Sequence, residues 1–251
     1  LSILAGGFIA LGAEFCTLVI FDSNLSIGLT KLLGGIAFSL GLVLVVVAGA
    51  ELFTGNNMVM VGFASRVVTC KQLLRNWSVS YLGNFIGAMV VVFIMFLTNQ
   101  WKMGDYMLGA KAVMIAANKV NLTFLEAFSR GILCNMLVCL AIWLCFSART
   151  VVSKIAAIIF PITAFVASGF EHSIANMYFI PMGILLKQNE SVANAVLKIA
   201  PDASLERLNV IGFLGNLLPV TIGNIIGGAV MVGLVYWLIF AFPKRLKKKK
   251  L

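Results

Sequence analysis

Two long apolar runs, each interrupted near its middle by one acidic residue, most constrain what this chain can fold into. Between positions 32 and 65 the only charged residue is Glu51, and between positions 155 and 186 it is Glu171, which His172 follows. A helix needs about 20 residues to cross a membrane, so each run is too long for one straight helix. We therefore expect two helices that break at mid-membrane, where the freed backbone groups must face protein or a water-filled cavity.

The composition indicates a chain that lies within a lipid bilayer. Hydrophobic types make up 61% of the residues and charged types 11%, with a mean hydropathy of +1.04, whereas a soluble domain has roughly 25% charged residues. These values exclude a soluble enzyme, a disordered chain and a secreted disulfide scaffold. We predict an all-α integral membrane protein, because the apolar stretches are long enough for helices. Six such stretches lie at about 1–21, 32–64, 77–98, 123–147, 155–186 and 210–242.

The two halves of the chain repeat one another. The segment Gly83–Ala88 matches Gly223–Gly228, and Asn57-Met58 after the first break matches Asn176-Met177 after the second. Chance similarity of glycine-rich helices is the alternative, but two matches in the same order favour a true repeat. Because three helices per half reverse the orientation of the next half, this pattern predicts a 3+3 inverted repeat, in which paired broken helices indicate a transport site.

The repeat and the charges together predict the domain organisation. We expect a single membrane channel domain over residues 1–251, with repeat halves at about 1–98 and 123–242 and a basic tail at 244–251. The net charge of +10 is a property of many nucleic-acid-binding proteins. A lysine run directly after an apolar helix is instead typical of contact with anionic lipid, so no nucleic acid partner is predicted.

Basic residues also predict the orientation in the cell (plasma) membrane. Lysines and arginines gather in the connections at 65–76 and 148–154 and in the tail. Cytoplasmic connections carry an excess of these residues, so we expect those segments and both termini in the cytoplasm. The connections at 99–122 and 187–209 are expected outside.

Glycine and proline positions add two local expectations. The pairs Gly83/Gly87 and Gly223/Gly227 are spaced as GxxxG, which predicts close approach of helix backbones. Pro219 is predicted to open the last helix, because proline is favoured in a first helical turn. That start would leave 208–218 as a surface element.

The cysteines do not indicate a metal site. The chain has five cysteines and a single histidine, and the spacing that zinc sites require is absent. Most of the cysteines lie inside apolar runs, where free cysteine behaves as a small apolar residue. No metal and no other cofactor is predicted.

The residues beside the two breaks are the candidates for chemistry. His172 is an ionisable group at mid-membrane, where such groups are functional by default, and imidazole exchanges a proton near neutral pH. Thr54 is positioned to offer a hydroxyl opposite His172; its alternative is a local backbone hydrogen bond. Glu51 and Glu171 are expected to be structural, because a carboxylate can hold the amides that a broken helix frees.

Three segments at the breaks and in the last helix, 48–58, 165–177 and 219–228, resemble the formate/nitrite transporter family, which includes hydrosulfide channels. The similarity covers nearly the whole chain. It implies an aquaporin-like fold of six helices with the second and fifth broken, and a homopentamer with one pore in each protomer. Leu1 is not an initiator methionine, so we expect the native N-terminus, which gates some family members, to lie upstream.

The resemblance also implies roles for individual residues. Five of them belong to the substrate pathway: Thr54, His172, the vestibule lysine Lys119, and the polar residues Asn135 and Asn224. Five others form constrictions: Phe38, Leu42, Leu52, Phe53 and Phe165.

Together these features predict a channel for small monovalent anions of weak acids, such as formate, nitrite or hydrosulfide. An anion that crosses apolar rings loses solvation worth on the order of tens of kcal/mol in the bare limit. Neutralising a carboxylic acid of pKa about 4 at pH 7 costs only roughly 4 kcal/mol. We therefore expect Lys119 to attract the anion, a proton to come from water or transiently from His172, and the neutral acid to pass. The overall resemblance leans towards the hydrosulfide branch.

Other functions compete with this prediction. The pore could conduct the anion itself beside a charged His172, and an inverted repeat also permits a proton-coupled transporter with alternating access. A membrane-embedded enzyme is disfavoured because the sequence contains no GxSxG or HExxH motif. A purely structural scaffold would leave the two paired polar breaks unexplained.

Overall fold

The computed structural model describes residues 1–243, and every regular element within them is helical. The predicted basic tail at 244–251 lies outside the described residues. Five helices are long and apolar enough to cross a membrane, judged by length and composition. They are α1 (Ser2–Ile20), α2 (Ile27–Val47), α5 (Cys70–Leu97), α7 (Phe124–Ser147) and Val210–Ala241, which comprises α11 (Val210–Ile225), η3 (Ile226–Leu234) and η4 (Trp237–Ala241).

Shorter helices lie between these spans. Two of them are apolar, α8 (Val151–Ala167) and α9 (Ser173–Leu186). The others are α3 (Phe53–Asn56), η1 (Asn57–Val59), α4 (Met60–Ala64), η2 (Gln100–Lys102), α6 (Met107–Val120) and α10 (Glu190–Ile199). The connections at 99–122 and 187–209 therefore contain helices of their own.

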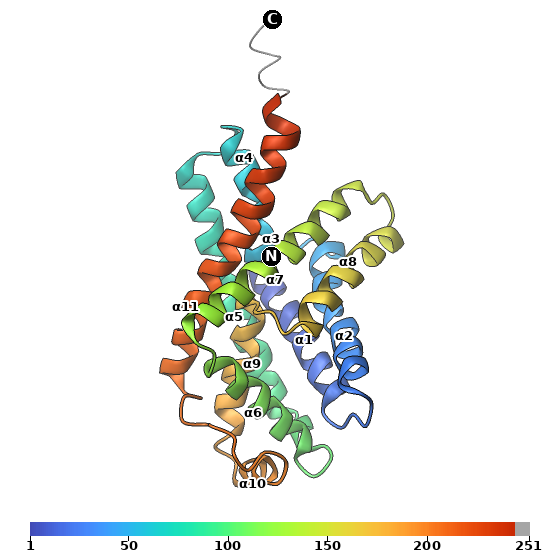
Figure 1. The fold of residues 1–251 in the computed structure, drawn as a ribbon, viewed down its shortest axis with the longest axis vertical. Coiled ribbons are helices and arrows are strands. Elements are labelled where there is room, and N and C mark those ends of the chain that lie inside the picture. Colours follow the sequence, from blue (N-terminus) through green and yellow to red (C-terminus); the bar gives the residue numbers. More distant parts are fainter. Residues whose placement is uncertain (244–251) are drawn as a thin grey trace, which may run out of the picture.

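Figure 1 shows which connections share an end of the molecule. The turn after α4, the yellow-green turn between α7 and α8, and the C-terminal end of the last span lie in the upper half, whereas α10 and the lower end of α6 lie at the bottom. The basic connections thus lie on one side and the mixed-charge connections on the other. The side that faces the cytoplasm stays a prediction.

Both predicted helix breaks are present, at residues 48–52 after α2 and at residues 168–172 after α8. Each contains a glycine with positive φ, +72° at Gly49 and +70° at Gly169, a conformation that side chains with a Cβ rarely adopt. In each break the N–H after the glycine donates to the carbonyl five residues earlier, over 2.8 Å in the first and 3.0 Å in the second. Both helices therefore end in the same C-cap geometry.

The predicted close approach at the GxxxG glycines is confirmed. A Cβ on Gly87 would lie 1.8 Å from the carbonyl oxygen of Ile3, and one on Gly227 would lie 2.1 Å from that of Ile132. No side chain fits such a gap. The glycines let α5 pack on α1 and the last span pack on α7 at backbone distance.

The predicted helix start at Pro219 is wrong. The helix begins at Val210, and the side chain of Asn209 caps it by accepting a hydrogen bond from the N–H of Gly212 at 2.9 Å. Pro219 is buried inside α11. An asparagine N-cap is a strong start signal, and neighbouring helices let a membrane helix tolerate an internal proline. Most of 208–218 is therefore part of the span rather than a surface element.

Candidate functional site

The two breaks bring Thr54 and His172 together. Both side chains are buried, with 0% and 3% of their surface exposed, and Thr54 Oγ1 lies 2.9 Å from His172 Nε2. Thr54 sits in the first turn after one break, and His172 is the last residue of the other. The hydroxyl and the imidazole thus meet in the interior, although 118 positions separate them in the sequence.

The second ring nitrogen of His172 has a structural role. His172 is the N-cap of α9, and its Nδ1 accepts a hydrogen bond from the N–H of Ala175 at 3.1 Å. A nitrogen that accepts carries no proton, so neutral His172 holds its proton on Nε2 and donates it to Thr54 Oγ1. His172 therefore does not use the Thr54 hydroxyl proton.

Two cavities lie at different levels along α2. His172 lines one of them, and Leu52 and Gly55, which flank the buried Thr54 in the sequence, line the other. The larger, named the Leu52 cavity, has a volume of about 480 Å³ and is lined by residues that include Val45, Leu52, Gly55, Ile142, Trp143 and Phe146. The smaller, named the His172 cavity, has a volume of about 160 Å³ and is lined by residues that include Cys16, Phe38, Lys119, Phe165, His172 and Phe179. Both are walled mainly by apolar side chains.

Leu42 lies between the two cavities. It is one helical turn after Phe38, which lines the His172 cavity, and about one turn before Val45, which lines the Leu52 cavity. Leu42 itself is 2% exposed and lines neither cavity. Its side chain is placed where a constriction between the cavities would be.

Aromatic rings narrow the His172 cavity. The Phe38 and Phe165 rings meet edge to face with centroids 5.5 Å apart, and the Phe165 ring stacks on His172 at 5.9 Å. Phe179, which the sequence did not single out, stacks on Phe38 at 6.5 Å. The imidazole is therefore reached through a gap between phenylalanine rings.

The structure places Phe53 differently from the expected constriction. Its ring packs edge to face against Tyr81 at 4.9 Å and against Trp77 at 6.3 Å, and it lines neither cavity. Successive side chains in a turn point in different directions, so Leu52 faces its cavity while Phe53 is turned towards α5. The motif alone gave no sign of this difference.

Comparisons with known proteins agree with the geometry. The model of the formate/nitrite transporter family matches residues 1–238. The chain belongs to this family. The family's members are named as channels and transporters, not as enzymes, so the predicted resemblance is confirmed and an enzyme is excluded.

Relatives and solved structures within the family cover nearly all of the chain. The formate channel FocA of Escherichia coli K12 is 43% identical over 96% of this chain and 85% of its own length. The probable formate transporter of Methanothermobacter thermautotrophicus is 40% identical over 94% of this chain and 86% of its own. These relatives are named for formate; the leaning towards hydrosulfide stays a prediction.

Two solved structures have the same fold. A pentameric formate channel with formate bound superposes with a TM-score of 0.86 at 45% identity, covering 95% of this chain and 94% of that one. An FNT family ion channel superposes with a TM-score of 0.80 at 30% identity, covering 95% and 88%.

The backbone groups freed at the first break are held by Asn84 on α5. Its Oδ1 accepts the N–H of Phe53 at 2.9 Å, and its Nδ2 donates to the carbonyls of Glu51 at 2.9 Å and Ser2 at 2.7 Å. One side chain therefore ties the downstream end of the break to α1.

Asn224 on α11 holds the second break in the way that Asn84 holds the first. Its Oδ1 accepts the N–H of Ser173 at 2.9 Å, and its Nδ2 donates to the carbonyls of Glu171 at 3.0 Å and Gly131 at 2.8 Å. The amide is fully used and lines neither cavity. The place of Asn224 in the substrate pathway stays a prediction; in the structure its amide holds the second break.

The structure contradicts the expectation that the carboxylates of Glu51 and Glu171 hold backbone amides freed at the breaks. Glu51 Oε2 accepts from the side chain of Asn56 at 2.5 Å, and Glu171 Oε2 accepts from that of Asn176 at 2.6 Å. A break frees both N–H and C=O groups, and a carboxylate can only accept. An asparagine amide offers a donor and an acceptor together, which is why Asn84 and Asn224 occupy those positions.

These contacts also shift the alignment of the two halves by one residue at this position. Each glutamate bonds the asparagine five positions later, so the equivalent of Asn176 is Asn56 and not Asn57. Asn57 bonds elsewhere: its Oδ1 accepts from Asn135 Nδ2 at 2.9 Å. The recurring spacing of glutamate and asparagine was the signal that would have found Asn56.

Asn135 lies behind Thr54 rather than in a cavity wall. Its Nδ2 is close to the carbonyl oxygens of Thr54 at 3.2 Å and Asn224 at 2.7 Å, and the residue is fully buried. It thereby joins the first break to α11 and holds the Thr54 backbone in place.

Lys119 reaches the His172 cavity, but its charge is paired. Its Nζ donates to Glu171 Oε1 at 2.9 Å, with 14% and 4% of the two side chains exposed. The ammonium also lies 5.2 Å from the centre of the Phe179 ring. Glu171 therefore offsets the charge of the ammonium group at this cavity, and the attraction of an anion by Lys119 stays a prediction.

Proposed function

We propose that this family member is a channel that carries formate across the membrane as the neutral acid. The single observation that carries the proposal is the buried contact of Thr54 with His172, which lines one apolar cavity, while the Thr54 neighbours Leu52 and Gly55 line a second one. The names of the relatives favour formate. Nitrite and hydrosulfide, the other small monovalent anions, are the alternative substrates.

Protonation of the anion follows from the apolar side chains that line the cavities and lie between them. The rings of Phe38 and Phe165 and the side chains of Leu42 and Leu52 cannot solvate a charge, and a bare ion would lose on the order of tens of kcal/mol. Protonating formate at neutral pH costs roughly 4 kcal/mol. The Lys119 ammonium draws the anion to the cavity, and the proton comes from water or transiently from His172.

The Thr54 hydroxyl then guides the neutral acid. Because His172 donates to Thr54 Oγ1, the hydroxyl proton is available to the carbonyl oxygen of the acid. Nδ1 of His172 is occupied by the α9 cap; a proton placed there would break that cap. We infer that the imidazole keeps its neutral form through most of the transport cycle and acts as a hydrogen-bond partner.

The same proposal extends to the architecture. We propose that α8 and α9 together form a sixth crossing, so that the chain is a single channel domain with a 3+3 inverted repeat, as in aquaporin-like folds. The matching bonds of Asn84 and Asn224 at the two breaks support it. The assembly is a homopentamer in the cell membrane with both termini cytoplasmic, as the pentameric neighbour and the basic connections favour.

Flux into liposomes tests the function. Purified protein is reconstituted, and uptake of formate, nitrite and hydrosulfide is followed side by side with an internal pH dye. We expect formate uptake well above that of empty liposomes, a fall of about tenfold or more for His172→Phe, and a smaller fall for Thr54→Val, which loses one hydrogen bond. Unchanged flux of all three acids in His172→Phe would remove the histidine from the mechanism.

A voltage measurement separates the neutral acid from the bare anion. Passage of formic acid moves no net charge, so a potential set with potassium and valinomycin should leave the formate flux unchanged. A flux that follows the potential would show conduction of the anion itself. Saturable flux coupled strictly to protons would instead support alternating access.

A further inference from the structure

A buried polar contact joins α9 to α1 away from the substrate pathway. Tyr178 is 2% exposed, and its hydroxyl donates to Oε2 of Glu14 on α1. Neither residue lines the Leu52 cavity or the His172 cavity. An ionisable side chain within a membrane-crossing helix is unfavourable unless it has a role, and the proposed mechanism gives Glu14 none.

The helix that carries Tyr178, α9, is short, and a proline interrupts its backbone hydrogen bonding. α9 starts at the second break and contains Pro181, which cannot donate a backbone hydrogen bond to the preceding turn. On its other side α9 packs against α6, where a Cβ on Gly183 would lie 2.3 Å from Cβ of Ala116. The rotation of α9 is therefore set by close packing on α6, by further packing on α5 and α11, and by its contacts with α1, which include the Tyr178 hydroxyl.

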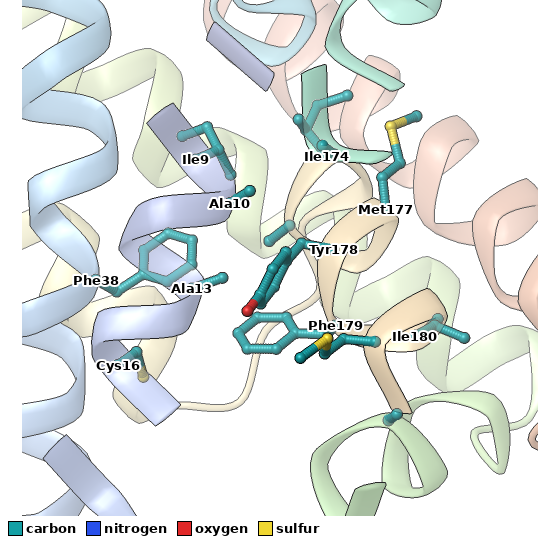
Figure 2. Close-up of a cluster of buried hydrophobic side chains, with 14 of the residues drawn as sticks. Ile9, Ala10, Ala13, Cys16, Phe38, Ile174, Met177, Tyr178, Phe179 and Ile180 are labelled. Carbon is teal, nitrogen blue, oxygen red and sulfur yellow. The ribbon is translucent and has the colours of Figure 1, made fainter. Parts of the chain in front are cut away.

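The residue after Tyr178 is the one that faces the cavity. Phe179 lines the His172 cavity and stacks on Phe38 with centroids 6.5 Å apart. In Figure 2 the Tyr178 hydroxyl points from α9 towards α1, and the Phe179 ring lies beside it. Neighbouring residues on a helix are related by a fixed rotation, so holding Tyr178 against Glu14 also holds the Phe179 ring against Phe38.

We propose that Glu14 and Tyr178 are positioning residues that set the gap between Phe38 and Phe179, and with it the largest weak acid that the channel passes. The inference deepens the proposed function and rests on it. Loss of the hydrogen bond lets α9 turn, the Phe179 ring moves away from Phe38, and larger acids enter the His172 cavity.

Size selectivity in liposomes tests the proposal. The ratio of formate to propionate permeability is measured for the wild type, Tyr178→Phe, Glu14→Leu and the double variant. We expect the ratio to fall about threefold in each single variant, the effect of one net hydrogen bond, and no further in the double variant. Glu14→Gln keeps an acceptor oxygen and should keep the wild-type ratio. Tyr236→Phe, whose ring packs on Trp143 at 4.6 Å, is the matched control.

Other outcomes overturn the proposal. A general loss of fold lowers both permeabilities without changing their ratio, and a Glu14→Gln variant as altered as Glu14→Leu would indicate charge and not the hydrogen bond. Cryo-electron microscopy of Tyr178→Phe gives a readout that does not depend on transport. If wild-type liposomes pass no formate, the proposed function fails, while a Phe38–Phe179 separation unchanged from 6.5 Å in the variant would refute the positioning role by itself.

Discussion

At the scale of single residues, the side chains of Asn84 and Asn224 hold the two breaks through buried hydrogen bonds. Asn84 and Asn224 each accept one backbone N–H and donate to two carbonyls. Both are fully buried, where no water can replace these bonds. The apolar layer can therefore hold an unwound segment because one amide side chain satisfies a donor and an acceptor at its downstream end.

Replacing Asn224 by leucine should strongly destabilise the protein. The variant leaves one N–H and two carbonyls without their partner, and each buried unpaired group costs about 1–3 kcal/mol. We expect a loss of about 3 kcal/mol or more, measured as a lower unfolding midpoint in detergent. Asn121→Ala is the control, because the Asn121 amide makes one exposed bond to the carbonyl of Ser204; equal losses in the two variants would contradict this account.

The Lys119–Glu171 pair gives a second prediction at this scale. Lys119→Met leaves a nearly buried carboxylate without its cation, which costs about 3–5 kcal/mol. The double variant Lys119→Met/Glu171→Gln removes both charges and should recover most of that stability. Thermal unfolding of the three proteins checks this, and a double variant no more stable than the single one would argue against the ion pair.

The Lys119→Met variant also bears on transport. Glu171 offsets the Lys119 charge, so we expect formate uptake to fall in Lys119→Met by a few-fold rather than to vanish, with a larger effect at low salt. Uptake that is independent of Lys119 at every ionic strength would remove its attraction of the anion.

At the scale of elements, the paired spans depend on glycine where backbones touch. Gly227→Ala would place a Cβ 2.1 Å from the carbonyl oxygen of Ile132, so α7 and the last span must separate. Overpacking of this kind costs about 1–3 kcal/mol. Gly215→Ala in the same span is the matched control, because nothing lies within 4 Å of its Cβ position.

The measurement is the unfolding midpoint of both variants in one detergent. Gly215→Ala should be as stable as the wild type or slightly more so, since alanine favours a helix over glycine. Equal behaviour of the two variants would show that backbone contact between the helices matters little.

At the scale of the whole molecule, the orientation in the membrane can be tested with one cysteine. Cys70 is exposed, whereas the other four cysteines are buried, and it starts α5 beside the basic connection at 65–76. A membrane-impermeant maleimide should label Cys70 in inside-out vesicles and not in intact cells. In a Cys70→Ser background, Asp202→Cys should show the reverse pattern. Labelling of Cys70 from outside would invert the proposed topology.

The sequence by itself determined the class of protein, the two breaks and the family. Each of these depends on one-dimensional properties: the length of an apolar run, the place of a single charge within it, and a motif of adjacent residues such as 165–177. The sequence also placed Thr54 just after the first break and His172 within the second. Such features do not depend on how the helices pack, so they could be predicted before the fold was known.

Only the tertiary structure decided which atoms bond the backbone groups freed at the breaks and which side chains line the cavities. The roles of Asn84 and Asn56, the paired charge of Lys119 and the turned ring of Phe53 all depend on contacts between helices distant in sequence. A hydrogen bond forms where packing brings a donor to an acceptor within about 3 Å, and neither residue type nor spacing fixes that distance. The contact of Glu14 with Tyr178, 164 positions apart, has the same physical origin.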